Sequence, residues 1–322
     1  MKALVLKQYW KPLVFEEKDE PEVSPHEVKI RTAYAGLSFT DSIIQKGLYQ
    51  YQREIAPLPL IPGFEASGTV ETIGDRVRRV AVGDKVMVMK RFGCLADTIV
   101  VNECLVTKLH HDADLKWAAS IPVNFFTAYH ALYNIVKIFP GSEILVTSAA
   151  GGVGGMILQL ASPENRMTAL VSHDKKVDYA LKLGAGEAFT YEKFSQSNKK
   201  FDVVLTAGGN DMSEYLKRLK RNGKLIVYGF HTLIPETKID LLAKFLRYLR
   251  LPKIDTTSLV YENRTVSGFN IIKFDQTSKE YAEAQKFLEK NVPGRTKLDA
   301  HDINVFETSE HELAFQHLNR RD

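Results

Sequence analysis

The sequence has few cysteines and no long apolar run, and both absences exclude classes of protein. Cys94 and Cys104 are the only cysteines among 322 residues, too few for a disulfide-rich scaffold or a four-cysteine zinc lobe. No run of about 18 apolar residues occurs, so we expect no membrane-spanning helix. The apolar start of the chain is short and is followed by Lys7 and Lys11, unlike a signal peptide. We therefore expect a soluble, cytoplasmic protein.

The sequence also lacks a strong excess of charge of either sign. It contains 43 Lys plus Arg and 39 Asp plus Glu, a net charge of +4. A nucleic-acid-binding domain usually has a clustered basic excess, so this balance argues against nucleic acid as a partner. Apolar residues make up 44% and charged residues 25%, as in folded globular proteins. The length suits about two domains.

The pattern of apolar segments changes near residue 115. Before it, Gly, Pro and Asp separate short apolar runs at 27–34, 68–73, 85–89 and 97–101, which predicts the hairpins of a compact β domain. After it, expected strands at 144–148, 167–171, 201–206 and 224–228 alternate with expected helices at 127–136, 152–161, 175–183 and 212–218. This alternation predicts a parallel sheet with helices on its faces, so the fold class is α/β.

The strongest local signal is the segment 144–161, ILVTSAAGGVGGMILQLA. An apolar strand leads into a glycine turn and then into a helix, with the spacing G-x-G-x-x-G and Ala149 in the first position. Gly151 would let the backbone approach a pyrophosphate, and Gly154 would let the helix pack closely on the strand. The helix N-terminus offers free N–H groups to phosphates. The alternative is a purely structural turn; we favour dinucleotide binding.

The end of the second strand bears on the choice between NAD and NADP. An acidic residue there would bind the ribose 2′-hydroxyl of NAD, and residues 171–173 contain none. Lys175 and Lys176 follow at a predicted helix start, where cations oppose the helix dipole. A bound 2′-phosphate would explain the basic pair, and simple solvation of the two side chains is the alternative. Asp174 is the counter-evidence, because it can serve as that acid or as a helix cap. We favour NADP.

The chain lacks a cluster of Cys and His residues at zinc-ligand spacing. Cys94 and Cys104 form no C-x-x-C motif, and His110 and His111 are adjacent in a predicted loop, where solvation explains them. His130 falls in a predicted helix and is expected to be packed or capped. We therefore expect no metal site.

Six segments resemble, in order, the motifs of one enzyme family: AGLSFTDSIIQKGLY, PLIPGFEASGTVETIGDRV, VGDKVMV, VNFFTAYHAL, PGSEILVTSAAGGVGGMILQLA and GKLIVYGF. The chain is identified as a zinc-less medium-chain dehydrogenase/reductase of the quinone oxidoreductase branch. Within the branch, VMVMKRFG, IPVNFFTAYHALYN and NRTVSGFNI resemble the synaptic-vesicle membrane protein (vesicle amine transport) subgroup. The resemblance implies a GroES-like β domain at 1–120 and 264–322, with a Rossmann NADP-binding domain inserted at 121–263.

The resemblance also implies site residues. Lys176 and Tyr191 match positions at the 2′-phosphate of NADPH, and Thr127 matches a residue beside the nicotinamide. The substrate-pocket candidates are Ser38, Tyr49 and Thr127, and no firm catalytic residue is implied. The cofactor-binding candidates are Thr127, Ala150, Gly151, Gly152, Val153, Gly154, Ser172, Lys176, Tyr191, Gly208, Gly229, Phe230 and Phe269.

Several positions depart from related patterns. Zinc-dependent members have ligands where this chain has the loop 36–38, Phe64 and Val123, none of which offers a usual ligand. The branch often has Asn where this chain has Ser38, which shortens the polar group. The chain ends at HLNRRD, where the family continues into a final strand, so we expect either a divergent or a truncated C-terminus.

The function implied by the resemblance is NADPH-dependent, zinc-independent reduction of quinones or other activated carbonyl compounds. An alternative is an NADPH-binding protein that works mainly at membranes or with partners, since the segment 241–253 has an apolar stripe surrounded by basic residues. The same segment also suits a helix that packs on its own domain. A homodimer through the sheet edge near 258–267 is expected, and a non-catalytic, crystallin-like role is a third interpretation.

Overall fold

The computed structural model describes residues 1–49, 57–208, 212–229, 254–291 and 303–320. The chain divides into two compact units. The first comprises Met1–Val123, Asp275–Thr296 and Asp302–Asp322, and the second comprises Asn124–Phe274 and Lys297–His301. None of the helices in the described residues has the length and apolar character needed to cross a membrane.

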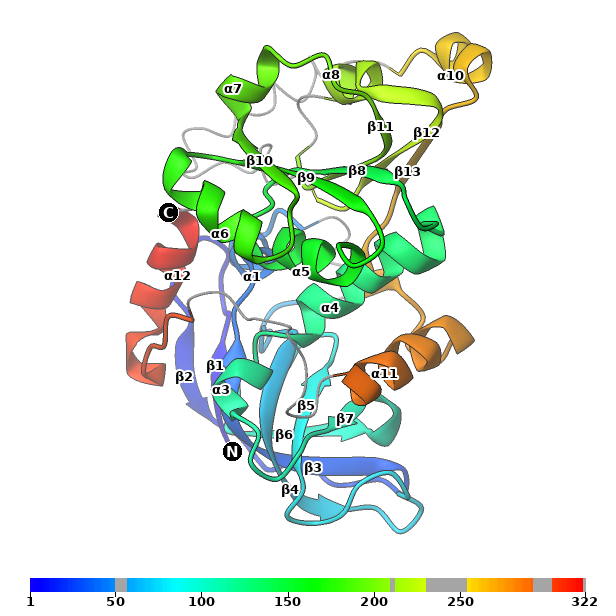
Figure 1. The fold of residues 1–322 in the computed structure, drawn as a ribbon. Coiled ribbons are helices and arrows are strands. Elements are labelled where there is room, and N and C mark those ends of the chain that lie inside the picture. The colour runs from blue at the N-terminus through cyan, green and yellow to red at the C-terminus, as the bar shows by residue number, and fades with distance from the viewer. Residues whose placement is uncertain (50–56, 209–211, 230–253, 292–302, 321–322) are drawn as a thin grey trace. The chain divides into compact units, whose positions relative to one another are not determined.

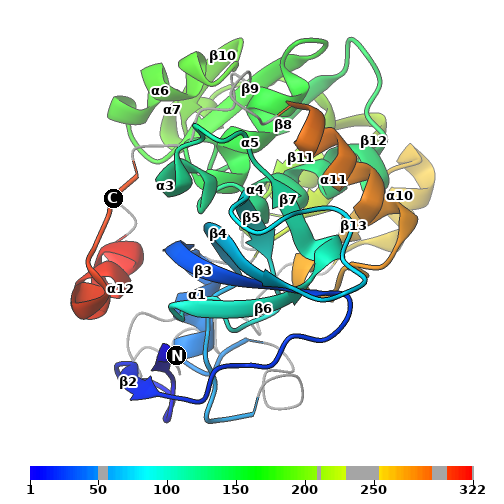
Figure 2. The same ribbon diagram turned by 90° about the horizontal axis from the view of Figure 1, so that it is seen from below.

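The first unit is built on antiparallel strands. Its five-stranded sheet has the order β6-β3-β4-β5-β7, and β6, β3 and β4 lie side by side in Figure 2. The strands are β3 (Glu27–Gly36), β4 (Glu65–Ile73), β5 (Lys85–Met89), β6 (Thr98–Asn102) and β7 (Val106–Lys108). A separate pair contains β1 (Lys2–Val5) and β2 (Val14–Glu17). Alternate residues such as Val28 and Ile30 point into a core of valines and isoleucines, as half-buried strands require.

Short helices surround these strands: α1 (Phe39–Gln45), η1 (Glu103–Leu105), α3 (Leu115–Ala118), α11 (Lys279–Asn291), η6 (Thr308–Glu310) and α12 (His311–Arg320). The two helices from the end of the chain pack on earlier segments of this unit. The buried Gln285 of α11 donates a hydrogen bond to the Val106 carbonyl oxygen (2.6 Å). In α12, the Asn319 side chain accepts hydrogen bonds from Ser42 (2.5 Å) and Lys46 (3.0 Å). These contacts join segments far apart in the sequence.

The second unit contains a six-stranded parallel sheet of order β10-β9-β8-β11-β12-β13. Its strands are β8 (Glu143–Val146), β9 (Arg166–Val171), β10 (Glu187–Thr190), β11 (Phe201–Thr206), β12 (Leu219–Val227) and β13 (Thr265–Gly268). The central strands are buried on both faces and are therefore runs of apolar residues. Figure 1 shows α5 (Gly152–Ala161) and α6 (Val177–Lys182) on one face, and α7 (Tyr191–Ser195) and α8 (Met212–Lys217) on the other. This arrangement confirms the predicted α/β fold with a Rossmann-type sheet.

The remaining elements of this part of the chain are α4 (Pro122–Tyr129), the π-helix η2 (His130–Val136), η3 (Asp174–Lys176), α10 (Thr256–Glu262) and η5 (Ile271–Lys273). The helix expected over 127–136 therefore starts earlier and changes from α to π geometry at His130. The last strand of the sheet, β13, ends at Gly268. The resemblance places a domain boundary at residue 263. In the structure β13 pairs in parallel with β12, and the second unit extends to Phe274.

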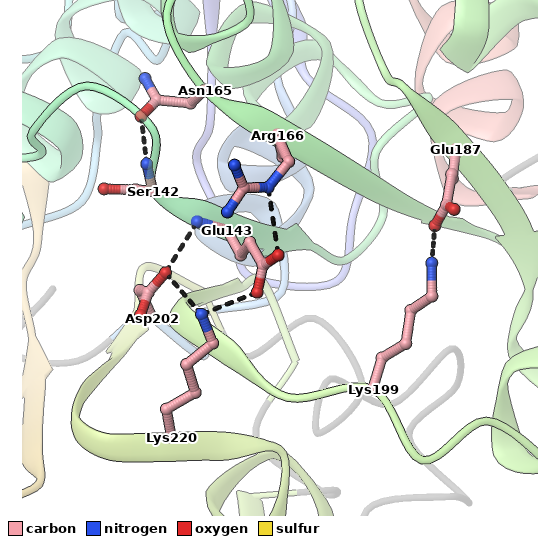
Figure 3. A network of polar contacts seen from close by, with 8 residues as sticks. All are labelled: Ser142, Glu143, Asn165, Arg166, Glu187, Lys199, Asp202 and Lys220. Carbon is pink, nitrogen blue, oxygen red and sulfur yellow. Dashed lines mark hydrogen bonds and ion pairs between the residues drawn. The ribbon is translucent and has the colours of Figure 1, made fainter.

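Charged residues connect the amino ends of the parallel strands (Figure 3). Glu143, at the start of β8, pairs with Arg166 of β9 (3.1 Å) and with Lys220 of β12 (2.7 Å). Asp202 of β11 accepts hydrogen bonds from the Glu143 backbone N–H (2.9 Å) and from Lys220 (3.0 Å). The hydrogen bond to Lys220 holds the pKa of Glu143 below its usual value. The opposite, carboxyl ends of the strands carry the site described next.

Candidate functional site

The glycine turn follows β8 at the carboxyl edge of the sheet. The strand order reverses between β8 and β11, and in open α/β sheets ligands bind at this switch point. Gly151 is the N-cap of α5, and Gly152, Val153 and Gly154 form its first turn. A Cβ atom on Gly154 would lie 2.4 Å from the Ser148 carbonyl oxygen, which only glycine avoids. The helix therefore approaches the preceding loop closely, and its N-terminal N–H groups face the edge.

Hydroxyl groups join the two strands at the switch point. Thr147 follows β8 and Thr206 ends β11; their Oγ1 atoms are 3.0 Å apart, and both residues are buried. The Tyr228 hydroxyl, just after β12, donates to the Thr147 carbonyl oxygen (3.3 Å). Burial raises the pKa of this phenol, so it remains protonated and a donor. The loops at this edge are thus held by bonds from three strands.

A second group of candidates lies after β9 and β10. Ser172 directly follows β9, and η3 contains Lys176 as well as Asp174. Tyr191 begins α7, and its hydroxyl accepts a hydrogen bond from the Ser148 backbone N–H (2.9 Å). This bond ties Tyr191 to the loop that carries Ala150 and the glycine turn.

An ion pair near these residues was not expected. Lys193 of α7 pairs with the Asp174 carboxylate at 2.7 Å. The sequence left Asp174 as an open alternative between ribose ligand and helix cap. No signal in the sequence indicates the pair, because its partners belong to different elements.

Other candidates lie after the remaining strands or on the preceding helix. Gly208, Gly229 and Phe269 follow the carboxyl ends of β11, β12 and β13. The Phe269 ring packs edge-on against His130, with centroids 5.0 Å apart, and Phe274 packs on the same imidazole at 4.2 Å. Thr127 lies in α4 and is buried. Phe230, as well as the basic segment 241–253, lies outside the described residues.

The substrate-pocket candidates Ser38 and Tyr49 belong to the first unit. Ser38 precedes α1, and the Asp41 carboxylate accepts hydrogen bonds from its backbone N–H (2.9 Å) and its hydroxyl (3.0 Å). A hydroxyl that donates to Asp41 has no second proton for a carbonyl oxygen. Tyr49 is only 7% exposed. These contacts therefore do not identify Ser38 or Tyr49 as a proton donor to a substrate.

Two buried carboxyl groups in this unit, Asp41 and Glu65, are not among the site residues that the sequence predicts. Burial raises the pKa of Asp41 to about 6, although Ser38 and Gly63 donate hydrogen bonds to it. Burial, together with a smaller effect of the neighbouring Asp41 charge, raises the pKa of Glu65 to about 8. The Val123 backbone N–H donates to Glu65 (2.8 Å). The Ser38-x-x-Asp41 spacing of a capping box could have indicated Asp41, but nothing in the sequence indicates the burial of Glu65.

Comparison with known proteins agrees with this arrangement. The model of the alcohol dehydrogenase GroES-like domain matches residues 24–121. The synaptic vesicle membrane protein VAT-1 homolog of Danio rerio is 31% identical over 82% of this chain and 56% of its own length. The VAT-1 homolog-like protein of Mus musculus is 30% identical over 84% of this chain and 67% of its own length.

A solved structure covers more of both chains. The quinone oxidoreductase of Thermus thermophilus, studied alone and in complex with NADPH, is 30% identical. The match covers 100% of this chain and 97% of that chain, with a TM-score of 0.79. The chain belongs to the quinone oxidoreductase branch of the medium-chain dehydrogenase/reductases. It spans only about 56% of the Danio rerio protein, so that relative has further sequence outside the match.

Two of the positions that the resemblance matches to zinc ligands have other contacts in this dehydrogenase/reductase. The buried Phe64 packs its ring on Phe92 with centroids 5.0 Å apart, and Val123 offers its backbone N–H to Glu65. In the described part of the chain, one group could hold a metal ion by proximity, namely His110, His111 and Asp112. All three are exposed in the loop between β7 and α3, and His110 and Asp112 already pair with each other.

Proposed function

We propose that this chain is an NADPH-dependent oxidoreductase that reduces quinones or other activated carbonyl compounds without a metal ion. The observation that carries the proposal is the glycine turn at the switch point, where Gly154 has no room for a side chain. That geometry suits a pyrophosphate at the N-terminus of α5. The similarity to an oxidoreductase studied in complex with NADPH supports the choice of cofactor.

The residues present fit such a cofactor along the carboxyl edge of the sheet. Gly151 to Gly154 would hold the pyrophosphate. Lys176 and Tyr191, after β9 and β10, would hold the adenosine side with its 2′-phosphate. Gly208, Gly229 and Phe269 would line the nicotinamide side, because the two mononucleotide halves bind on opposite sides of the switch point. When bound, the cofactor supplies the hydride, and the protein orients it and the acceptor.

We assign no catalytic residue to the first unit. Ser38 is engaged with Asp41, and Tyr49 is buried, so we propose that the proton reaches the reduced acceptor from solvent. The expected zinc independence rests on the residue types at Ser38, Phe64 and Val123, none of which is a usual zinc ligand.

The test is the oxidation of NADPH by the purified chain with and without an ortho-quinone, with NADH in parallel. We expect acceptor-dependent turnover that prefers NADPH. Thermal melting with each cofactor separates binding from chemistry, because a ligand that binds the folded state raises the melting temperature. A chain that shows neither turnover nor a shift with either cofactor would refute the proposal.

A second candidate function is NADPH binding with little catalysis, in a protein that acts at membranes or with partners. The similarity to the VAT-1 homologues favours it. The basic segment 241–253 is its proposed contact with anionic lipid. Flotation with anionic vesicles should recover the wild-type chain and not the Leu246→Glu variant. Equal recovery of both, or of neither, removes the membrane interpretation.

We also propose that the chain is a cytoplasmic homodimer. β13 is the edge strand of the described parallel sheet and leaves one side without a paired strand, and the neighbouring α10 exposes Val260 and Tyr261. An unpaired edge beside exposed apolar side chains suits association with a second copy. Light scattering after gel filtration should give twice the mass of one chain, and a Val260→Lys, Tyr261→Lys variant should give the mass of one.

A further inference from the structure

Asp174 lies near the place in the fold where an acid would select NAD, three residues after the end of β9. It follows β9 at the carboxyl edge of the sheet and begins η3. In dinucleotide-binding folds, an acidic residue near this point binds the ribose 2′-hydroxyl and repels a 2′-phosphate. A free carboxylate here would therefore oppose the proposed preference for NADPH.

The carboxylate is not free in this chain. Lys193 Nζ lies 2.7 Å from Asp174 Oδ1, a distance typical of a charge-assisted hydrogen bond. Lys175 and Lys176 follow Asp174 in η3. The four side chains together carry one negative and three positive charges, a net +2. A ribose 2′-phosphate carries a charge of about −1.5 to −2 at neutral pH, by analogy with other phosphate monoesters, so the group is electrostatically matched to it.

Lys193 is held in place by its own element. The Lys193 backbone N–H donates to Thr190 Oγ1 (3.4 Å) at the start of α7. The first residue of the helix, Tyr191, is bonded through its hydroxyl to the Ser148 backbone N–H. The position of Lys193 is therefore linked to the loop that leads into the glycine turn.

The ion pair contributes little to the fold. The side chains of Lys193 and Asp174 are 64% and 67% exposed, and pairs this exposed add little to stability. We therefore expect this ion pair to influence mainly the binding of a charged ligand beside it.

We infer that Lys193 determines cofactor preference by neutralising Asp174, so that the site accepts a 2′-phosphate and Asp174 does not capture a 2′-hydroxyl. This inference rests on the proposed function, because it requires a dinucleotide at this edge. Lys193 is a specificity-determining residue that acts through Asp174.

The test uses ligands without a nicotinamide, so that no turnover is involved. Calorimetry measures the binding of adenosine 2′,5′-bisphosphate and of adenosine 5′-monophosphate to the whole chain and to its Lys193→Gln, Asp174→Asn and doubly substituted variants. Lys193→Gln should weaken the bisphosphate about tenfold, as expected for loss of one charge beside the ligand. It should strengthen the binding of the monophosphate, because the freed Asp174 carboxylate can then accept a hydrogen bond from the ribose 2′-hydroxyl. In the double variant, the bisphosphate affinity should return to within about threefold of wild type.

Lys199→Gln is the matched control, because Lys199 is also an exposed lysine paired with a carboxylate, that of Glu187. It should bind both ligands as wild type does. Equal weakening of the bisphosphate by Lys199→Gln and Lys193→Gln would overturn the inference, since net charge alone would then explain the loss. A double variant as weak as Lys193→Gln would also overturn it, because Lys193 would then act on the phosphate and not on Asp174. Failure of the wild-type chain to bind either ligand would instead refute the proposed dinucleotide site together with the inference.

Discussion

Replacing Glu65 with glutamine should remove a large part of the pH dependence of stability in the first unit. Glu65 is 3% exposed, and the Val123 backbone N–H is its hydrogen-bond donor. Glutamine has nearly the same shape and keeps an oxygen for this bond. It carries no charge at any pH, so the change isolates the ionisation of one buried carboxyl group.

The magnitude follows from the pKa of Glu65, which burial raises from 4.5 to about 8. Between these two values the folded chain retains a proton that the unfolded chain releases, so the free energy of unfolding falls as pH rises. Each pH unit removes about 1.4 kcal/mol. Over the whole interval the loss is about 5 kcal/mol. The stabilisation is complete below pH 4.5 and is lost as pH rises through about 8.

Urea denaturation, followed by circular dichroism at several pH values in this interval, measures the effect. The wild-type free energy of unfolding should fall more steeply with pH than that of Glu65→Gln. The two slopes should differ by about 1.4 kcal/mol per pH unit, the slope that corresponds to one bound proton. Burial raises the pKa of Asp41 to about 6, so in the variant the free energy of unfolding should still fall with pH, but less steeply than in the wild type. Glu17→Gln is the control, because Glu17 is exposed in β2 of the same unit. Equal slopes for wild type and Glu65→Gln would refute the reasoning.

Three further predictions concern other parts of the fold. Gly154→Ala should destabilise the second unit by about 1–3 kcal/mol and abolish the rise in melting temperature with NADPH. Gly186→Ala, whose Cβ would lie 3.6 Å from its nearest neighbour, should do neither. Glu143→Gln should lower the free energy of unfolding by about 1 kcal/mol at neutral pH, as measured by urea denaturation. Because ion pairing lowers the pKa of Glu143, this difference should shrink as pH falls and the wild-type carboxylate is protonated. Gln285→Leu should lower the unfolding free energy by about 1–3 kcal/mol, since the Val106 carbonyl oxygen would lose a buried donor; an unchanged melting temperature would contradict this.

Local patterns in the sequence predicted the elements whose ends are marked by local chemistry. The strand 85–89, the strand 201–206 and the helix 152–161 have the expected bounds. Each has a charged residue or a glycine directly beside at least one end: Lys90 after the first, Lys200 before the second and Gly151 before the helix. The start of β12 was missed. We expected it at residue 224, but it begins at Leu219, where Lys220 pairs with Glu143 and Asp202. The extension depends on pairing with β11, where Leu219 lies opposite Phe201, and on the ion pair of Lys220 with Glu143 of β8, so no local periodicity indicates it.

The candidate site also contains residues that local sequence predicts and residues that it does not. The glycine turn is a contiguous motif, so its position at the end of β8 and the start of α5 was predictable. The pairing of Asp174 with Lys193 joins two elements through side chains, and the sequence could only leave Asp174 as an ambiguity. The burial of Glu65 depends on neighbours from several segments. Residues whose chemistry is set by tertiary neighbours are those that sequence reasoning cannot assign.

The parallel strands carry their ion-pair network at one end and their candidate ligand positions at the other. Glu143, Arg166, Asp202 and Lys220 lie at the amino ends (Figure 3), whereas the residues proposed to contact the cofactor follow the carboxyl ends. Substitutions near β9 and β10 that alter ligand preference therefore leave this network intact. We therefore expect that nucleotide preference can change during evolution through a few exposed residues such as Lys193. A selection library confined to those loops should yield altered specificity at little cost in folded protein.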